Sequence, residues 1–315
     1  AQAKKAAGVK ELLKKGADDN AAQGDGMTAL HWAALNGDAE VAQMLLYAGA
    51  NVGAKTRIGG YTPLHLAAQV GNASVIAPLV AAGAQVGAAT ATGTTALMQA
   101  AHSGSTESVR ILLENGADPN AKEIANGQTA LMFAAASDRL DVVKMLLSRG
   151  ADVSITSRVE DFASLTMTND ADQNGVPRPQ APPPPGGKDI PGVTRPFNYN
   201  ELIGKHGGLA ALHFAARQGA MATAEALIKG GANINQRGAG DKTTPILVAA
   251  INGHFDLVSY LLDNGADPNL PSEGGVTPLY AVINVQWQPR SFYPQPRAYL
   301  QQKTDYLTLM KKLLD

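Results

Sequence analysis

The dipeptide Gly-Ala recurs along this chain at a nearly constant interval. Seven of its eleven copies form a series that begins at residues 16, 49, 83, 116, 150, 231 and 265, with spacings of 33, 34, 33, 34, 81 and 34 residues. A fixed period between about 20 and 50 residues is typical of a solenoid, in which each unit buries its apolar face only against its neighbours. The interval therefore predicts one elongated domain for the 315 residues, and not two globular ones.

The segment YTPLHLAAQVGNASVIAPLVAAGAQV, which starts at Tyr61, shows what one unit contains. Thr62 is a good N-cap, and Pro63 suits the first position of a helix because the N–H group that it lacks would have no partner there. Gly71 is expected to end this first helix in a left-handed conformation. The apolar stripe that follows predicts a second helix, which Gly83 ends in the same way. Each unit is therefore a helix pair followed by a Gly-rich turn.

The same pattern recurs as TALHWAALNG from Thr28, TALMQAAHSG from Thr95, TALMFAAASD from Thr129, AALHFAARQG from Ala210 and TPILVAAING from Thr244. A seventh copy, TPLYAVIN, begins at Thr277, and LLENGADPN ends at Asn120. These strings resemble the ankyrin repeat. The resemblance implies an all-α fold, an ankyrin-repeat solenoid of stacked helix-turn-helix units with projecting turns, interrupted by a long Pro-rich insert. The insert, the seventh repeat and the order of the copies are also similar to exported bacterial ankyrin-repeat proteins.

The spacing divides this single solenoid into unequal parts. We expect a partial N-terminal repeat at 1–24, repeats 1 to 4 at 25–156, a Pro-rich insert at 157–207, and repeats 5 and 6 at 208–275. Residues 276–315 form an atypical, incomplete repeat 7 with an expanded inter-helix loop at 284–303. An open apolar face after repeat 7 would require a capping unit, so we expect a longer natural chain.

The insert holds eight of the chain's 18 prolines, which favours an extended centre. Its C-terminal part, RPFNYNELIG, carries Phe197, Tyr199, Leu202 and Ile203, which predict an anchored segment. Repeat 5 then starts with Ala210 where other repeats have an N-cap Thr. We expect the insert to satisfy that helix end.

Composition excludes several classes of function. The formal net charge is −1, from 26 basic and 27 acidic residues without a basic stripe, so no nucleic-acid partner is expected. No run of 18 apolar residues occurs, so no membrane insertion is expected. The string AQA at the start is typical either of a trimmed chain or of the product of a signal peptidase, which favours export.

The sequence contains no recognisable catalytic or metal-binding motif. Cysteine is absent, no histidines have metal-ligand spacing, and no serine stands in a nucleophile elbow. The resemblance gives His31, His65 and His213 a structural role in hydrogen bonding between loops. We therefore expect no cofactor, no metal, no catalytic residue and no enzymatic activity.

A rigid stack favours binding of a protein partner, because its side chains are held in place before the partner arrives. The resemblance places the groove on the turn tips and on the exposed ends of the first helices. The expected tip residues are Asp25, Met27, Tyr61, Thr94, Gln128 and Lys242. The expected helix residues are Leu35, Asn36, Gln69, His102, Ser103, Arg217, Gln218 and Asn252.

Repeat 7 supplies a second set of expected contacts. Aromatic and arginine side chains dominate interface hot spots, and the expanded loop carries Trp287, Arg290, Tyr293 and Arg297. The alternative is that the aromatic rings of this loop fold back over the end of the stack.

Three hypotheses follow. The first is a non-catalytic protein-protein interaction module that presents a concave groove to a partner. The second is a structural subunit of a larger assembly or filament, joined to other chains through the stack ends or the insert. The third is an enzyme. The residues favour the first and do not name the partner.

Overall fold

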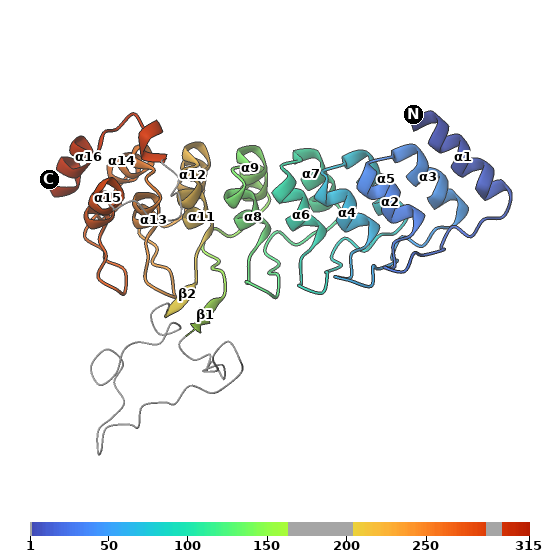
Figure 1. Ribbon diagram of the computed structural model, residues 1–315, viewed down its shortest axis with the longest axis horizontal. Coiled ribbons are helices and arrows are strands. Elements are labelled where there is room, and N and C mark those ends of the chain that lie inside the picture. The colour runs from blue at the N-terminus through green and yellow to red at the C-terminus, as the bar shows by residue number, and fades with distance from the viewer. Residues whose placement is uncertain (1, 163–203, 288–297) are drawn as a thin grey trace, which may run out of the picture.

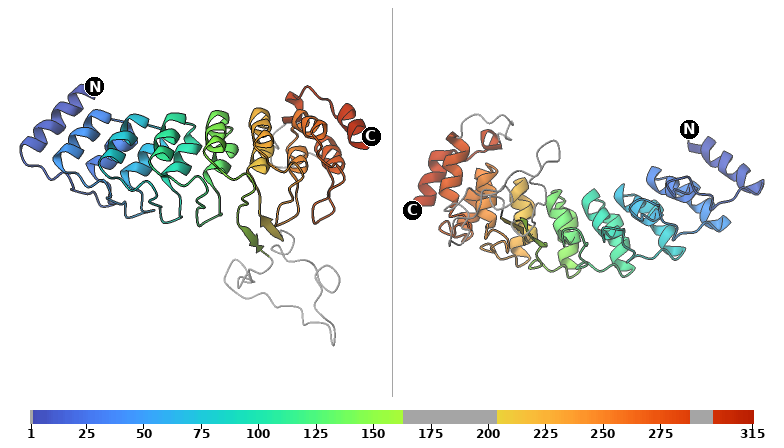
Figure 2. Two further views of the ribbon diagram at one scale, coloured as in Figure 1. Left: turned by 180° about the vertical axis from the view of Figure 1, so that it is seen from behind. Right: turned by 60° about the horizontal axis from the view of Figure 1, so that its bottom comes forward.

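The computed structural model describes residues 2–162, 204–287 and 298–315. Helix pairs stack into a curved row with the two termini at opposite ends (Figures 1 and 2). The first helices are α2 (Ala29–Asn36), α4 (Pro63–Gln69), α6 (Ala96–Ser103), α8 (Ala130–Ala136), α11 (Ala211–Gln218), α13 (Pro245–Ile251) and α15 (Pro278–Trp287). The second helices are α1 (Gln2–Lys14), α3 (Ala39–Ala48), α5 (Ala73–Ala81), α7 (Thr106–Glu114), α9 (Leu140–Ser148), α12 (Met221–Lys229), α14 (Phe255–Asp263) and α16 (Tyr306–Leu314). The prediction of an all-α solenoid of helix-turn-helix units is confirmed.

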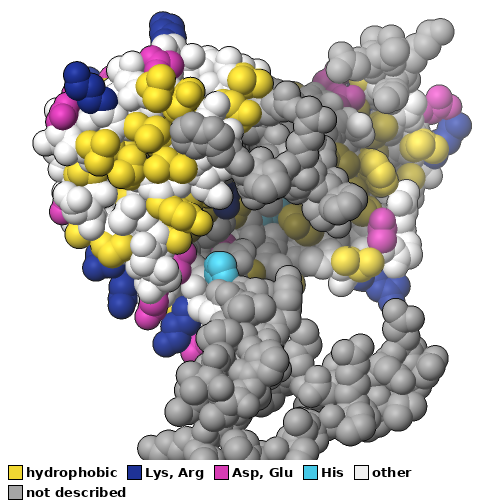
Figure 3. Space-filling view, turned by 60° about the vertical axis from the view of Figure 1, so that its left-hand side comes forward, with side chains coloured by type: hydrophobic (Ala, Val, Ile, Leu, Met, Phe, Trp, Pro, Cys, Tyr) yellow, Lys and Arg dark blue, Asp and Glu magenta, His cyan; other side chains and the backbone are white. Residues whose placement is uncertain are grey.

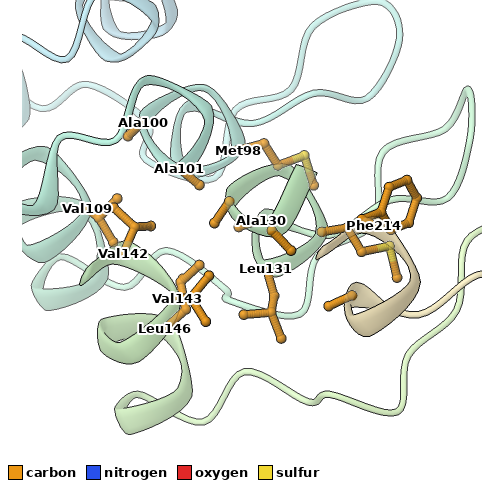
Figure 4. Close-up of a cluster of buried hydrophobic side chains, with 14 of the residues drawn as sticks. Met98, Ala100, Ala101, Val109, Ala130, Leu131, Val142, Val143, Leu146 and Phe214 are labelled. Atoms are coloured by element: carbon orange, nitrogen blue, oxygen red, sulfur yellow. The ribbon is translucent and has the colours of Figure 1, made fainter. Parts of the chain in front are cut away.

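Successive first helices pack closely because their contact positions are small. The pairs Ala100–Ala101 and Ala134–Ala135 are fully buried, and alanine lets the axes of neighbouring helices approach. Figure 4 shows α8 between α6 and α11, with side chains of the second helices closing the core on one side. Each leucine buried there, such as Leu131 or Leu146, contributes about 2 kcal/mol. The core therefore runs through the stack without a break.

The turns between repeats project from one side of the stack (Figure 1), and we call them fingers. Fingers 1 to 7 comprise residues 21–28, 54–62, 88–95, 121–129, 155–162 with 204–210, 236–244, and 270–277. Backbone hydrogen bonds join each finger to the next. The Arg57 N–H donates to Asp25 O (2.8 Å), and the Ile124 N–H donates to Thr92 O (2.8 Å). This ladder continues to finger 7, where the Glu273 N–H donates to Asp241 O (2.6 Å).

The ladder brings backbones into close approach at Gly93. Its φ is +82°, and a Cβ atom there would lie 2.5 Å from the Ile124 nitrogen. A larger residue would separate fingers 3 and 4, so glycine is required at this position.

The insert leaves the stack from finger 5. Strand β1 (Val159–Asp161) pairs antiparallel with β2 (Lys205–Gly207), and the Phe162 ring packs edge-on against His206 (5.8 Å between centroids). At the base, Ser157 exchanges two hydrogen bonds with Leu209, of 2.9 and 3.0 Å. The ends of the expected insert therefore belong to the finger. The segment expected to be anchored, up to Ile203, lies outside the described residues.

The start of repeat 5 lacks the side-chain cap that several other repeats have. The Ala210 N–H donates to Nδ1 of His213 (3.2 Å), as the Thr62 N–H does to His65. The His213 N–H, which would donate to a Thr hydroxyl, donates to Ala210 O instead (3.0 Å). The described part of the insert supplies no cap there, contrary to our expectation.

Repeat 4 departs from the pattern at the turn between its helices. Other repeats have a glycine with positive φ there, such as Gly104 and Gly219, whereas repeat 4 has Asp138 with φ 51°. This conformation costs a non-glycine residue roughly 1 kcal/mol. The Asp138 carboxylate offsets that cost by accepting a 2.7 Å hydrogen bond from the Thr223 hydroxyl of repeat 5.

The Asp138–Thr223 bond stands in for a hydrogen bond found between other repeats. In those repeats, the residue after the turn position is the donor. Asn72, Arg139 and His254 each donate to a backbone carbonyl of the preceding repeat, at 3.1 to 3.2 Å. Repeat 5 has Ala220 at that position. The Asp138–Thr223 pair therefore links repeats 4 and 5 on the side of the stack away from the insert.

Two helix boundaries, one near each end of the chain, differ from our expectation. Helix α15 continues to Trp287, beyond the expected loop start at 284, because no glycine ends it as Gly253 ends α13. Helix α1 is continuous from Gln2, where only a short segment was expected before a second helix near Val9.

We expect Thr223→Val to lower the free energy of unfolding by about 1 to 2 kcal/mol, because it leaves the Asp138 carboxylate without its hydroxyl donor. Urea denaturation followed by circular dichroism measures the change. Thr223→Ser keeps the hydroxyl and should remain close to wild type. Equal losses for Val and Ser would assign the effect to packing.

Candidate binding groove

The fingers and the ends of the first helices together line one face of the stack, which we call the groove. Its shape depends on buried histidines at the base of three fingers. The Thr62 N–H donates to Nδ1 of His65 (3.2 Å), so Nε2 carries the proton and donates to Ala88 O of the next finger (3.1 Å). His31 and His213 make the same pair of bonds, ending at Tyr61 O (3.0 Å) and Thr243 O (3.1 Å). The predicted role of these residues between loops is confirmed.

Burial keeps these rings neutral. Desolvation lowers the pKa of His31, His65 and His213 below the ordinary value of 6.5, and hydrogen bonds to backbone carbonyls oppose that shift only in part. A neutral ring can accept at Nδ1, whereas an imidazolium could not. Protonation would therefore break the connection between a helix start and the next finger.

In finger 4, a buried carboxylate and not a histidine makes the hydrogen bonds that hold the loop. The Glu123 side chain is 3% exposed and its Oε1 accepts the N–H groups of Asn126 (2.7 Å) and Gln128 (3.0 Å). Charge-assisted hydrogen bonds from two backbone donors offset the desolvation cost of burying a carboxylate. This residue was not singled out from the sequence, where it reads as one more surface acid.

The structure places the predicted contact residues along the groove at two levels of exposure. Asp25, Asn36, Gln69, His102, Arg217, Gln218 and Lys242 are exposed. Met27, Leu35, Tyr61, Thr94, Ser103, Gln128 and Asn252 are half-buried. Neither set shows by itself which of these residues bind a partner.

Several of these side chains also make hydrogen bonds or ion pairs that stabilise the helices and fingers themselves. The Asn36 amide donates to Trp32 O (2.8 Å), and the Asp25 carboxylate accepts the Met27 N–H (2.9 Å). Lys242 adopts φ 59° at a finger tip and pairs with Glu273 (3.6 Å). A substitution at these positions would change the finger as well as the surface.

Two predicted residues contact rings. The Arg217 guanidinium lies 5.3 Å from the centre of the Phe214 ring, within the range of a cation–π contact. Tyr61 packs edge-on against His65, with 6.2 Å between centroids. These contacts hold both side chains in place at the groove surface.

Of the expected contacts in repeat 7, Arg290, Tyr293 and Arg297 lie outside the described residues, and only the backbone of Trp287, at the end of α15, is described. The return of this loop is visible. The Tyr299 ring packs against Phe255 (6.2 Å), and the Asp256 carboxylate accepts the N–H groups of Lys303 and Thr304. Tyr299 therefore packs on repeat 6. The alternative for this loop, in which its rings cover the end of the stack, stays a prediction.

The structure also shows exposed apolar residues that were not expected. Ile58 and Ile124 lie on fingers and are 81% and 70% exposed; Val70 and Ile251 lie at first-helix ends and are 46% and 51% exposed. Their repeat positions alone could have marked them, since Val70 directly follows the expected Gln69.

The described residues contain neither a metal-ligand cluster nor a membrane-spanning helix. Nowhere among them do three His, Cys, Asp or Glu side chains come together as a metal site. No helix in the described ranges has the length and apolar character needed to cross a bilayer.

Comparison with known proteins gives one family and several relatives. The family model described as "Ankyrin repeats (3 copies)" matches residues 1–90, 48–123, 64–157 and 198–284. Protein phosphatase 1 regulatory subunit 27 is 40% identical over 73 residues in mouse and 38% over 73 residues in human, covering 22% of this chain and 46% of each relative. Regulatory protein NPR5 of Arabidopsis thaliana is 39% identical over 70 residues, covering 22% of this chain and 14% of that protein. The chain spans less than half the length of these relatives.

Among solved structures, the ankyrin repeat domain of Bcl-3, named in its description as a unique member of the IkappaB protein family, superposes with a TM-score of 0.59. The match covers 92% of this chain and all of that domain, at 23% sequence identity. At this identity the likeness establishes the fold.

We expect the free energy of unfolding to fall as the pH drops below about 6.5, since the unfolded chain binds protons at its histidines there while the folded state keeps them neutral. The stabilisation is complete above 6.5 and is lost toward the lowered pKa values of the folded state. His65→Met, which copies Met98 and Met132 of repeats 3 and 4, should make urea midpoints between pH 7 and pH 5 less pH-dependent. An unchanged slope would contradict the assignment.

Proposed function

The chain belongs to the ankyrin-repeat family, and on that premise we propose that it is a non-catalytic interaction module whose concave groove binds a protein partner. The observation that carries this proposal is the finger ladder. Backbone bonds of 2.6 to 3.3 Å hold the fingers to one another. A surface fixed in this way loses little conformational entropy when a partner binds.

The relatives support a regulatory role. Two of them carry the name of a phosphatase regulatory subunit and a third is named a regulatory protein. A regulatory subunit acts by binding, so these names agree with a module that has no reaction of its own. Export and a bacterial source remain part of our proposal, although these relatives come from mouse, human and Arabidopsis.

We assign the contacts to the groove residues described above and to the loop of repeat 7. The exposed side chains of Gln69, His102 and Arg217 lie at first-helix ends of repeats 2, 3 and 5. Trp287, Arg290, Tyr293 and Arg297 would extend the contact region beyond repeat 6. Aromatic and arginine side chains contribute most of the binding energy in typical interfaces.

A second candidate function is assembly with other chains through the C-terminal end of the stack. Figure 3 shows hydrophobic side chains gathered over that end. Tyr280 and Leu307 are 57% and 60% exposed, whereas Leu247 and Phe255, at the matching positions of repeat 6, are buried under repeat 7. An open repeat face of this kind can bind a further helix pair.

We expect a photocrosslinking amino acid at position 69 or 217 to capture the same partner from native extract, since both positions lie in the groove. The control is position 43, an exposed glutamine on α3 behind the groove. Mass spectrometry of the crosslinked product identifies the partner. Capture at position 43 alone would argue against the groove.

For the assembly hypothesis, sedimentation velocity over a concentration series should show association that Leu307→Asp and Tyr280→Asp weaken. Both side chains are exposed, so these changes should leave the melting temperature within a few degrees of wild type. A chain that stays monomeric at every concentration would eliminate assembly through this face.

A further inference from the structure

A run of groove positions in repeats 2 and 3 carries no formal charge. Residues 58–106 contain no Asp, Glu, Lys or Arg, and they supply α4 to α6, most of finger 2 and all of finger 3. Six groove residues of this run concern us here: Ile58, Tyr61, Gln69, Val70, Thr94 and His102. We call these six residues the neutral half of the groove.

The rest of the chain is not poor in charge. Charged residues make up 17% of the sequence, and the groove of repeats 5 to 7 carries Arg217, Arg237, Lys242 and Glu273, of which Arg217 and Lys242 were expected contacts. All four are exposed. The neutral half is therefore a local property of repeats 2 and 3.

The neutral half combines apolar surface with uncharged hydrogen-bonding groups. Ile58 and Val70 expose aliphatic side chains. The Gln69 amide is exposed and makes no hydrogen bond with the residues that the structure describes. The His102 ring is exposed and bonds to the Ser137 hydroxyl (2.7 Å).

This surface discriminates against a charged partner. The charged side chains at its edges, Arg57 and Arg139, already donate to the carbonyls of Gly24 (2.6 Å) and His102 (3.2 Å).

A carboxylate or ammonium group pressed against the neutral half would therefore lose hydration without gaining a free counter-charge, which is costly. An uncharged segment avoids that cost, and the cores of protein interfaces are depleted of charge for the same reason. Amide and hydroxyl side chains of a partner can pair with Gln69 and Thr94, whereas aliphatic or aromatic ones can cover Val70 and Ile58.

We infer that the neutral half of the groove binds a segment of the partner protein that is free of Asp, Glu, Lys and Arg and that places apolar side chains on Val70 and Ile58. The inference rests on the proposed function and names the chemistry of the partner. Its binding is driven by apolar burial and neutral hydrogen bonds, so it changes little with ionic strength.

The test uses a phage-displayed library of random peptides of about 12 residues, selected on the full chain. Selected peptides should lack the four charged residue types in their contact stretch. Their affinity, measured by fluorescence anisotropy, should change less than about twofold between roughly 50 and 500 mM salt. Val70→Glu should weaken binding about tenfold or more, as expected at a contact worth over 1 kcal/mol.

The control outside the groove is Tyr47→Glu, at an exposed position of α3 behind the groove, and it should leave peptide affinity unchanged. Ile251→Glu is the comparison inside the groove. Ile251 is also apolar, about half exposed and at the end of a first helix, but it lies in the charged half, so its substitution should weaken binding less than Val70→Glu. Circular dichroism and melting curves establish that all three variants fold.

Each contrary result has a distinct meaning. Selected peptides that are charged and sensitive to salt, or that respond to Ile251→Glu and not to Val70→Glu, overturn the inference and leave groove binding intact. Peptides that respond to no groove substitution, or a library that yields no peptide competed by soluble protein, count against the proposed function as well.

Discussion

The contact between successive first helices is the interaction on which the rest of this structure depends. Paired alanines let these helices approach closely, and packed helices are usually about 8 to 10 Å apart. Each finger contributes two extended segments, and two strands at about 4.8 Å each occupy nearly the same distance. The helix stack and the finger ladder therefore share one repeat length. A bulky residue at the alanine contacts would pull the ladder apart, although no finger residue had changed.

Much of this arrangement could be predicted from the sequence, because the signals are local. Thr62 and Pro63 start a helix, and glycines such as Gly104 end one through their own backbone preferences. The rest depended on tertiary partners. Asp138 occupies a glycine position because Thr223, 85 residues away, holds its side chain. No rule about neighbouring residues connects this pair.

The groove was predictable in outline and not in detail. Repeat position placed Gln69 and Arg217 on the exposed side, and both are exposed. Ile58 and Val70 stand at equally exposed repeat positions, but they were missed because aliphatic residues are most often buried. Binding itself is a further step, because a solvated side chain and a contact residue look alike in the free protein.

The stem formed by β1 and β2 separates the insert from the stack, so that the insert does not alter the spacing of the repeats. Arg158 bonds to Asn126 of finger 4, and the Gly208 N–H donates to Arg158 O (3.1 Å), so the two ends of the insert are fixed one strand apart within the ladder. A change in the length or composition of the insert beyond this stem therefore leaves the spacing of the repeats on either side constant. Natural variation in this protein should accumulate there before it reaches the stack.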